Sequence, residues 1–309
     1  MTSSPSYVCA RGGVPHEPVG AQVARRDHSA TTGGPLDVRP GAAGCRDALP
    51  RSLAIRALAV SFAFVLCFAA TARAAPTVTA VGQAVPILGF PHTGNILGAG
   101  AAVHAQVKIS GSEYGGFPPP LIGITVDLPV GVKLDPRDFP SCPAAVILDE
   151  REPRKCPKGS SAGPPGKAFG VVEFGSERVP ETTEILSFYA PGGGLEFLVL
   201  GHSPVALEVP VSSRLEPAGT SPGFGPVFTG EVPLIQTVPG APDASAQAIE
   251  ITLGTAIRKH GKAYYYGRVP KSCPKGGFRV RSEFVFAEEG DPERPEPVVV
   301  PFRAPCPRK

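Results

Sequence analysis

The residues from Gly159 to Gly163 match the G-x-S-x-G pattern of a hydrolase nucleophile elbow. In such an elbow a strand runs into a sharp turn and a helix leaves it, which lifts the serine above an oxyanion hole. Here a Cys-Pro corner precedes the motif and Pro164-Pro165 follows it, a pair that cannot begin the required helix. We therefore expect a loop at this place and no nucleophilic serine.

Histidines are the second group that could do chemistry. Their spacing in the sequence points to none of them as a metal ligand or a catalytic residue. No two lie at i, i+2 or i, i+4 on a common element, the spacing that brings metal ligands together. A catalytic triad assembled from distant parts of the chain stays open, because triads are defined by geometry and not by order. We expect structural or solvated histidines, no metal site and no cofactor. The four histidines after the N-terminal region are His92, His104, His202 and His260.

Acidic residues gather at Asp135 and Asp138, with Asp127 upstream. A calcium site needs several oxygen ligands that converge on one loop, often with a glycine at its sharp turn. Arg137 lies between the two closest carboxylates, and no further ligand stands nearby. A solvated turn therefore fits this stretch better than a metal site.

Tyr264-Tyr265-Tyr266 is the densest aromatic run in a chain that has no tryptophan. In a strand, Tyr264 and Tyr266 share one face and Tyr265 takes the other. If both rings of that face were exposed and coplanar, they could stack on a sugar, as in a carbohydrate-binding module. Tyrosine is also a good strand former, so we expect core and cross-strand packing and keep the stacking pair as an alternative.

Cysteine usage indicates disulfides in the C-terminal three quarters of the chain. Of seven cysteines, four follow the N-terminal region, at Cys142, Cys156, Cys273 and Cys306. A four-cysteine metal site would need Cys-x-x-Cys pairs, and none occurs. In an oxidising compartment an even number predicts two disulfides, with three pairings open. We favour Cys142 with Cys156 and Cys273 with Cys306, because short loops close most easily.

An export signal explains why the cysteines would oxidise. Arg51 and Arg56 precede an unbroken apolar run at 57–70, and Ala72-Arg73-Ala74 supplies small residues for cleavage. This order is typical of a secretory signal peptide at 51–74. A retained membrane anchor is the alternative, although a span needs about 20 apolar residues. We expect a secreted or cell-envelope protein that begins near Ala75, with no membrane segment in its mature form.

The first 50 residues are rich in Gly, Arg, Pro and Ala and show no apolar periodicity. We interpret 1–50 as a disordered leader or a mis-assigned start. Eight of the 30 basic and four of the 27 acidic residues lie before Ala75, which leaves 22 against 23. A net charge of −1 with no basic cluster excludes nucleic acid as a partner.

Short alternating runs dominate residues 75–309, and helical periodicity is almost absent. Ile122, Ile124, Val126 and Leu128 alternate with small or polar residues, which predicts a half-buried strand. Residues 195–200 are nearly all apolar, as in a strand covered on both faces. About a dozen such strands with Gly and Pro between them predict an all-β protein, an antiparallel β-sandwich or two packed sandwich-like units. Residues 215–230 are weakly patterned and are predicted to form an internal linker or a long loop.

One heptapeptide occurs twice, at 153–159 (Pro-Arg-Lys-Cys-Pro-Lys-Gly) and 270–276 (Pro-Lys-Ser-Cys-Pro-Lys-Gly). Each copy reads as a proline-bracketed corner tied down by a disulfide and ended by glycine. With the export signal and the Cys306-Pro307 ending, these corners resemble a family of exported β-rich proteins of high-GC Gram-positive bacteria. The resemblance covers most of 121–309, and it implies no activity and no functional residue.

These observations favour a disulfide-stapled, non-enzymatic protein with a structural or binding role at the cell envelope or outside the cell. Its partner would be a glycan or a protein of the envelope. Two alternatives remain from other classes: a secreted glycan hydrolase and a carbohydrate-binding module. The hydrolase would need two carboxyl groups about 5–10 Å apart in a cleft, and the module would need Tyr264 and Tyr266 exposed.

Overall fold

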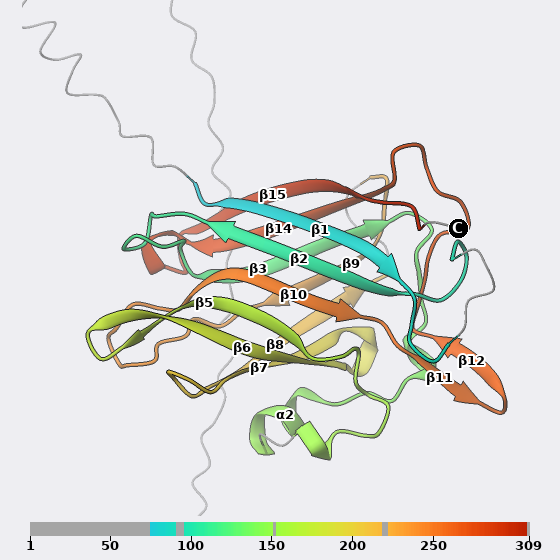
Figure 1. Ribbon diagram of the computed structural model, residues 1–309, viewed down its shortest axis with the longest axis horizontal. Helices are drawn as coiled ribbons and strands as arrows, with labels where there is room; N and C mark the ends of the chain where they lie inside the picture. Colours follow the sequence, from blue (N-terminus) through green and yellow to red (C-terminus); the bar gives the residue numbers. More distant parts are fainter. Residues whose placement is uncertain (1–74, 91–95, 151–152, 218–221, 308–309) are drawn as a thin grey trace, which may run out of the picture. The chain divides into compact units, whose positions relative to one another are not determined.

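The computed structural model describes residues 75–90, 96–150, 153–217 and 222–307, all within one compact unit of the chain, 70–309. The predicted leader (1–50) and signal peptide (51–74) lie outside the described residues, as does His92. The described part is nearly all strand, and the strands of its main sheet are antiparallel (Figure 1). The predicted all-β antiparallel class is confirmed.

Eleven strands form one continuous sheet, in which neighbours along the sheet are hydrogen-bonded. In hydrogen-bonding order they are β1 (Thr77–Val85), β2 (Ala102–Ser110), β10 (Ser245–Leu253), β5 (Gly166–Phe174), β6 (Glu177–Tyr189), β7 (Leu195–Gly201), β8 (Leu207–Glu216), β9 (Phe224–Glu231), β3 (Leu121–Pro129), β14 (Phe278–Ala287) and β15 (Pro295–Ala304).

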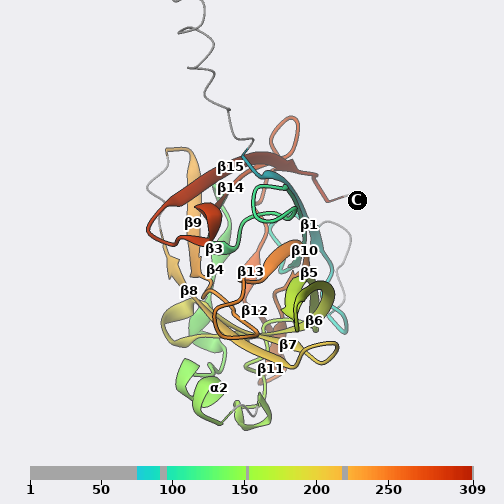
Figure 2. The same ribbon diagram turned by 90° about the vertical axis from the view of Figure 1, so that its left-hand side faces the viewer.

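The large sheet bends round on itself, so that its two halves face each other across an apolar interior. Figure 2 shows β15 and β14 at the top, β1, β10 and β5 down one side, β3, β9 and β8 down the other, and β7 below. The main core cluster joins buried residues of both halves, among them Val78 of β1 and Phe284 of β14. The facing layers expected of a sandwich are thus halves of a single sheet.

The two edge strands, β1 and β15, lie side by side and close the curve (Figure 2). Within the described residues they are the two ends of the hydrogen-bonded order, so side chains join them and no ladder does. Val298, Val300 and Phe302 of β15 pack on the cluster that contains Val78 and Ala80 of β1. We call this contact line the β1–β15 seam.

Prolines explain why the seam has no ladder. Pro295, Pro297 and Pro301 stand at alternate positions of β15, which pairs with β14 along its whole length. Successive N–H groups of a strand point to opposite edges, so these three residues lack their donors on the same edge, the one turned away from β14. Pro297 and Pro301 therefore mark β15 as an edge strand.

In the described residues, two small sheets and four 3-10 turns lie outside the main sheet. The hairpin of β11 (Ala256–Lys259) and β12 (Lys262–Tyr265) is separate from the main sheet, and β4 (Lys133–Leu134) pairs with β13 (Gly267–Arg268). The 3-10 turns are η1 (Pro136–Asp138), η2 (Pro153–Lys155), η3 (Pro191–Gly193) and η4 (Glu288–Gly290).

A short helix, α2 (Ala144–Glu150), was not expected from the sequence. It lies against the outer face of the sheet, where Ile147 packs with Phe188 of β6 and Leu198 of β7 (Figure 1). Seven residues give too few turns for a visible 3.6-residue period, which is why the pattern missed it. Because α2 covers the outer face of β7 and the inner face of β7 lines the interior, both faces of this strand are apolar.

The stretch 215–230, predicted as a linker or long loop, belongs mostly to strands. Leu215 of β8 pairs with Phe228 of β9, and Glu216 pairs with Val227. In the described residues β8 and β9 are neighbours in one sheet, so the prediction of an internal linker is wrong. Glycine and proline inside these strands weakened their alternation and gave the impression of a loop.

Candidate functional site

An apolar cavity of about 470 Å³ lies inside the curved sheet. This volume falls within the range of about 300–1,000 Å³ that is usual for small-molecule sites. Strand alternation turns every second side chain of the surrounding strands toward it. Large apolar side chains of β3, β7 and β8 line one side: Ile124, Val126, Leu128, Leu195, Phe197, Val199, Leu207, Val209 and Val211.

Small residues at several inward positions of the opposite side contribute to this space. Alanine or glycine stands there beside larger lining residues such as Val107, Ile249 and Ile251, and the small residues leave interior volume unfilled. The small lining residues of β1, β2, β5 and β10 are Ala80, Gly82, Ala84, Ala105, Ala168, Gly170 and Ala246. The alternation that predicted these strands therefore also encodes the cavity, through the size of the inward residues.

One end of the cavity is accessible from outside. Val103 of β2 lines the cavity, yet 45% of its surface is exposed. It pairs with Ala84 near the end of β1 and with Leu253 at the end of β10. The cavity therefore reaches solvent where these two strands end. Arg268, on the neighbouring β13, also lines it and is exposed.

A buried aromatic cluster borders the cavity near the β11–β12 hairpin. The Tyr189 and Tyr266 rings stack with centroids 4.1 Å apart, and the Phe139 ring meets both edge-on. The Tyr266 hydroxyl donates to the Gly193 carbonyl, and the Tyr189 hydroxyl accepts from the Thr255 N–H at 2.9 Å. Burial raises the pKa of Tyr189 to about 12, and burial together with the Tyr189 hydroxyl raises the pKa of Tyr266 further.

This cluster overturns the carbohydrate-stacking alternative. Tyr266 is 5% exposed and its ring packs inside the molecule, so Tyr264 and Tyr266 cannot form an exposed platform. The chain leaves the strand after Tyr265, which ends β12, and the alternation assumed for the three tyrosines does not continue. The prediction of core packing is confirmed for Tyr266.

The serine motif lies in a loop, as expected. Ser160 is buried, while Ser161 is exposed and donates its hydroxyl hydrogen to the Gly163 carbonyl at 2.8 Å. The next element is the strand β5, not a helix. The strand–turn–helix frame of a nucleophile elbow is therefore missing around Ser161.

The three histidines in the described residues lie apart from one another. His104 is in β2, and its Nδ1 lies 3.0 Å from the Thr252 hydroxyl on the outer face of the sheet. His202 follows β7, and His260 occupies the turn between β11 and β12 with a positive φ of 50°. Among the described residues, no three His, Cys, Asp or Glu side chains are grouped so as to hold a metal ion.

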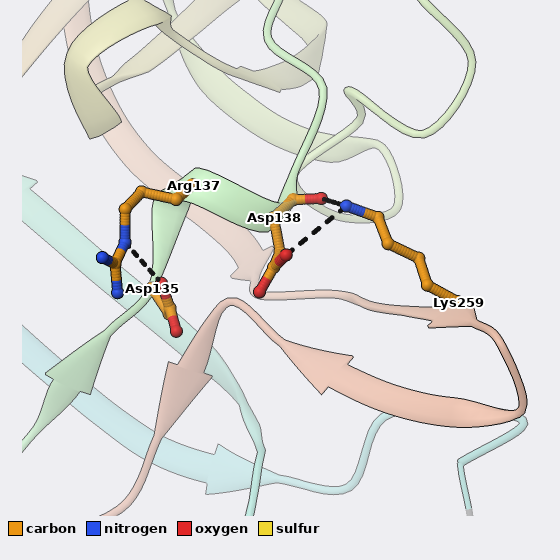
Figure 3. Close-up of polar contacts among 4 residues, drawn as sticks. All are labelled: Asp135, Arg137, Asp138 and Lys259. Carbon is orange, nitrogen blue, oxygen red and sulfur yellow. Dashed lines mark hydrogen bonds and ion pairs between the residues drawn. The ribbon is translucent and has the colours of Figure 1, made fainter.

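The acidic residues near η1 are each matched by a basic side chain. Figure 3 shows two separate pairs: Asp135 with Arg137 at 3.4 Å, and Asp138 with Lys259 at 3.5 Å. The second pair ties η1 to the β11–β12 hairpin beside the aromatic cluster. Asp127 lies elsewhere, buried in β3.

Both disulfides are present in the favoured pairing. Cys142 is bonded to Cys156 and Cys273 to Cys306, with Cα atoms 5.2 and 5.9 Å apart. The first bond holds the segment that carries α2 against the outer face of β6 and β7. The second ties the loop before β14 to the end of the chain after β15. Both copies of the heptapeptide therefore serve as disulfide corners.

Glu181 is the functional candidate that sequence reasoning missed. It is 2% exposed, and among the described residues it is the one carboxylate that lines the cavity. Sequence offered one signal, which is an acidic residue in phase with Thr183 and Ile185 on the inward face of β6. Two other buried acids, Glu196 and Asp243, have a pKa raised by burial, but neither lines the cavity.

None of the helices in the described part of the chain has the length and hydropathy needed to span a membrane. Comparison of the chain with protein-family models, curated proteins and solved structures finds no match.

Proposed function

We propose that this is an exported, disulfide-stabilised, non-enzymatic protein that binds a small apolar molecule inside its curved sheet. The observation that carries the proposal is the interior cavity, whose lining is almost entirely apolar and which reaches solvent beside Val103. Transfer of apolar surface from water into such a space is favourable by about 25 cal/mol per Å². A preformed cavity also spares the cost of reorganising the protein on binding.

Export is supported by the sequence at 51–74 and by the two disulfides, which persist in oxidising compartments. A non-enzymatic role is supported by the make-up of the cavity. A glycan hydrolase needs a pair of carboxyl groups across its substrate, and the described lining contributes Glu181 alone.

Dye binding tests the cavity. The hydrocarbon dye 1,6-diphenyl-1,3,5-hexatriene, which fluoresces in apolar surroundings and has no hydrogen-bond donor, is expected to bind the secreted protein saturably at a single site. A variant with Ala105→Leu and Ala168→Leu fills inward positions and should bind the dye roughly tenfold more weakly or worse. Ala248→Leu is the matched control, because Ala248 lies on β10 and does not line the cavity.

A wild-type protein with both disulfides intact that shows no saturable dye binding would contradict the proposed cavity function. Export is tested separately by mass spectrometry of the culture medium. We expect a mature N-terminus near Ala75 and a gain of about 4 Da on reduction of the two disulfides. Recovery of the chain from the cytosol with free thiols would contradict export.

A further inference from the structure

Glu181 lies on the inner face of β6, in a lining that is mostly apolar. It is in phase with Thr183 and Ile185, which also line the cavity. Its cross-strand neighbour on β5 is Gly170, which has no side chain that could neutralise it. A carboxylate in such surroundings is unfavourable unless hydrogen bonds or an opposite charge compensate it.

The protein compensates only one of the two carboxylate oxygens. Oε2 accepts a hydrogen bond from the Val205 N–H at 3.1 Å, whereas Oε1 is buried and has no partner within the described structure. Gly201 leaves the room for this carboxylate, because a Cβ there would stand 3.2 Å from Oε1. Only Oε2 is therefore held by the chain itself.

The register of the sheet places Glu181 far from the exposed end of the cavity. Glu181 pairs with Gly170, which pairs with Ala246 at the start of β10, whereas Val103 pairs with Leu253 at its end. Seven residues separate Ala246 from Leu253, which corresponds to roughly 23 Å along a strand. Glu181 thus lies toward the end of the cavity opposite Val103.

We propose that the occupant is an elongated apolar molecule with a hydrogen-bond-donating end, an amine or a hydroxyl, and that Glu181 receives this end through Oε1. This inference rests on the proposed function and adds the chemical class of the ligand to it. The donor supplies the partner that Oε1 lacks, and a protonated amine also supplies the opposite charge. A ligand that ends in a carboxylate is disfavoured there by like-charge repulsion.

Competition among ligands of equal chain length tests the assignment. Dodecylamine, dodecanol and dodecanoate, each below its solubility limit or critical micelle concentration, are titrated against protein loaded with the hydrocarbon dye 1,6-diphenyl-1,3,5-hexatriene. In the wild type the amine and the alcohol should displace the dye about tenfold more effectively than dodecanoate. Dye affinity itself reports the cavity, independently of any polar end.

Glu181→Gln is the informative variant. Its amide oxygen can still accept from the Val205 N–H, while its amide nitrogen puts donors where Oε1 stood. We expect an approximately tenfold loss for the amine and a gain for dodecanoate. The affinity for the hydrocarbon dye, which has no group that could donate to Glu181, should change much less. Glu184→Gln is the matched control, because Glu184 lies on the same strand, is exposed and does not line the cavity.

The outcomes distinguish failure of the Glu181 role from failure of the proposed cavity function. If dye binds but Glu181→Gln leaves the amine-to-carboxylate ratio unchanged, or if the wild type prefers dodecanoate, the role of Glu181 is wrong and the cavity function stands. If no dye binds to the wild type, the cavity function fails and this inference fails with it.

Discussion

At the scale of single residues, the two most buried carboxylates of the sheet differ in their partners. Asp127 on β3 is 2% exposed, and its Oδ2 lies 3.0 Å from the Arg281 guanidinium, which also binds Glu283 at 2.8 Å. Glu181 is equally buried and has one N–H as its partner. The protein thus neutralises Asp127 completely and leaves Glu181 in need of a donor.

The Asp127–Arg281 pair predicts an asymmetric mutational response. Arg281→Met strands a buried charge, so it should lower the free energy of unfolding by about 3 kcal/mol or more. Adding Asp127→Asn to the same variant should recover part of this loss, because the remaining partner, Glu283, is partly exposed and no fully buried charge is then left unpaired. Urea denaturation of the two single variants and the double variant measures the coupling, and a loss below about 1 kcal/mol for Arg281→Met would contradict it.

The buried tyrosines predict a loss of stability in alkali. Burial raises the pKa of Tyr189 to about 12, whereas an unfolded tyrosine titrates near 10. Between these values the unfolded chain loses a proton that the folded chain keeps, so the free energy of unfolding falls as pH rises above 10, by about 1.4 kcal/mol per pH unit and tyrosine. Denaturation midpoints from pH 8 to 12 should fall less steeply in a variant with Tyr189→Phe and Tyr266→Phe.

At the scale of elements, alternation predicted strands such as β3, and the apolar run at 195–200 predicted the buried strand β7. The loop that joins β7 to β8 covers 202–206. Signals carried by single residues, such as the cysteines at the two corners, also predicted the structure correctly. Short elements without a full period, above all α2, could not be predicted.

The first disulfide should stabilise α2 more than the rest of the fold. The double substitution Cys142→Ser with Cys156→Ser opens the loop that this disulfide closes, whose ends are 14 residues apart. It should lower the free energy of unfolding by about 3 kcal/mol. Because Cys142 is fully buried beside Ile147, backbone amides around Phe188 and Leu198 should also exchange faster with solvent. The pair Cys273→Ser with Cys306→Ser is the control, since it should lower global stability without a selective change at α2.

The prolines of β15 predict which positions of this strand accept another proline. Val299 shares the phase of Pro297 and Pro301, so its N–H points away from β14 and Val299→Pro should be nearly neutral. Val300→Pro would remove a hydrogen bond of the β14–β15 ladder and leave its acceptor unpaired, which should cost about 1–3 kcal/mol. Thermal unfolding of the two variants measures the difference, and equal losses would contradict the proposed direction of the N–H groups.

At the scale of the whole molecule, closure of the sheet was not visible in the sequence. Pairing of β10 between β2 and β5, and of β3 between β9 and β14, joins segments far apart in the chain, and local patterns do not specify such partners. The cavity follows from this closure, and so does the burial of Glu181. The alanines and glycines at inward positions could be identified from the sequence. The sequence did not show that the fold would bring them together around one cavity.

Occupation of the cavity should stabilise the entire fold. A ligand that binds only the folded state raises the free energy of unfolding by about 2.7 kcal/mol at a hundredfold excess over its dissociation constant. Dodecylamine should therefore raise the melting temperature of the wild type and not that of the variant filled at Ala105 and Ala168. Differential scanning calorimetry measures both, and an equal shift in the filled variant would point to surface adsorption.

The β1–β15 seam has a consequence for what the interior can accept. Everywhere else the circumference of the sheet is set by ladders of backbone hydrogen bonds, which resist stretching. Along this one line, Phe302 lies against Gly82 and the valines of β15 meet the small residues of β1, so apolar contacts alone hold the wall together. The sheet can widen along the seam without breaking a ladder of hydrogen bonds. We therefore expect its circumference to adapt to ligands of different thickness.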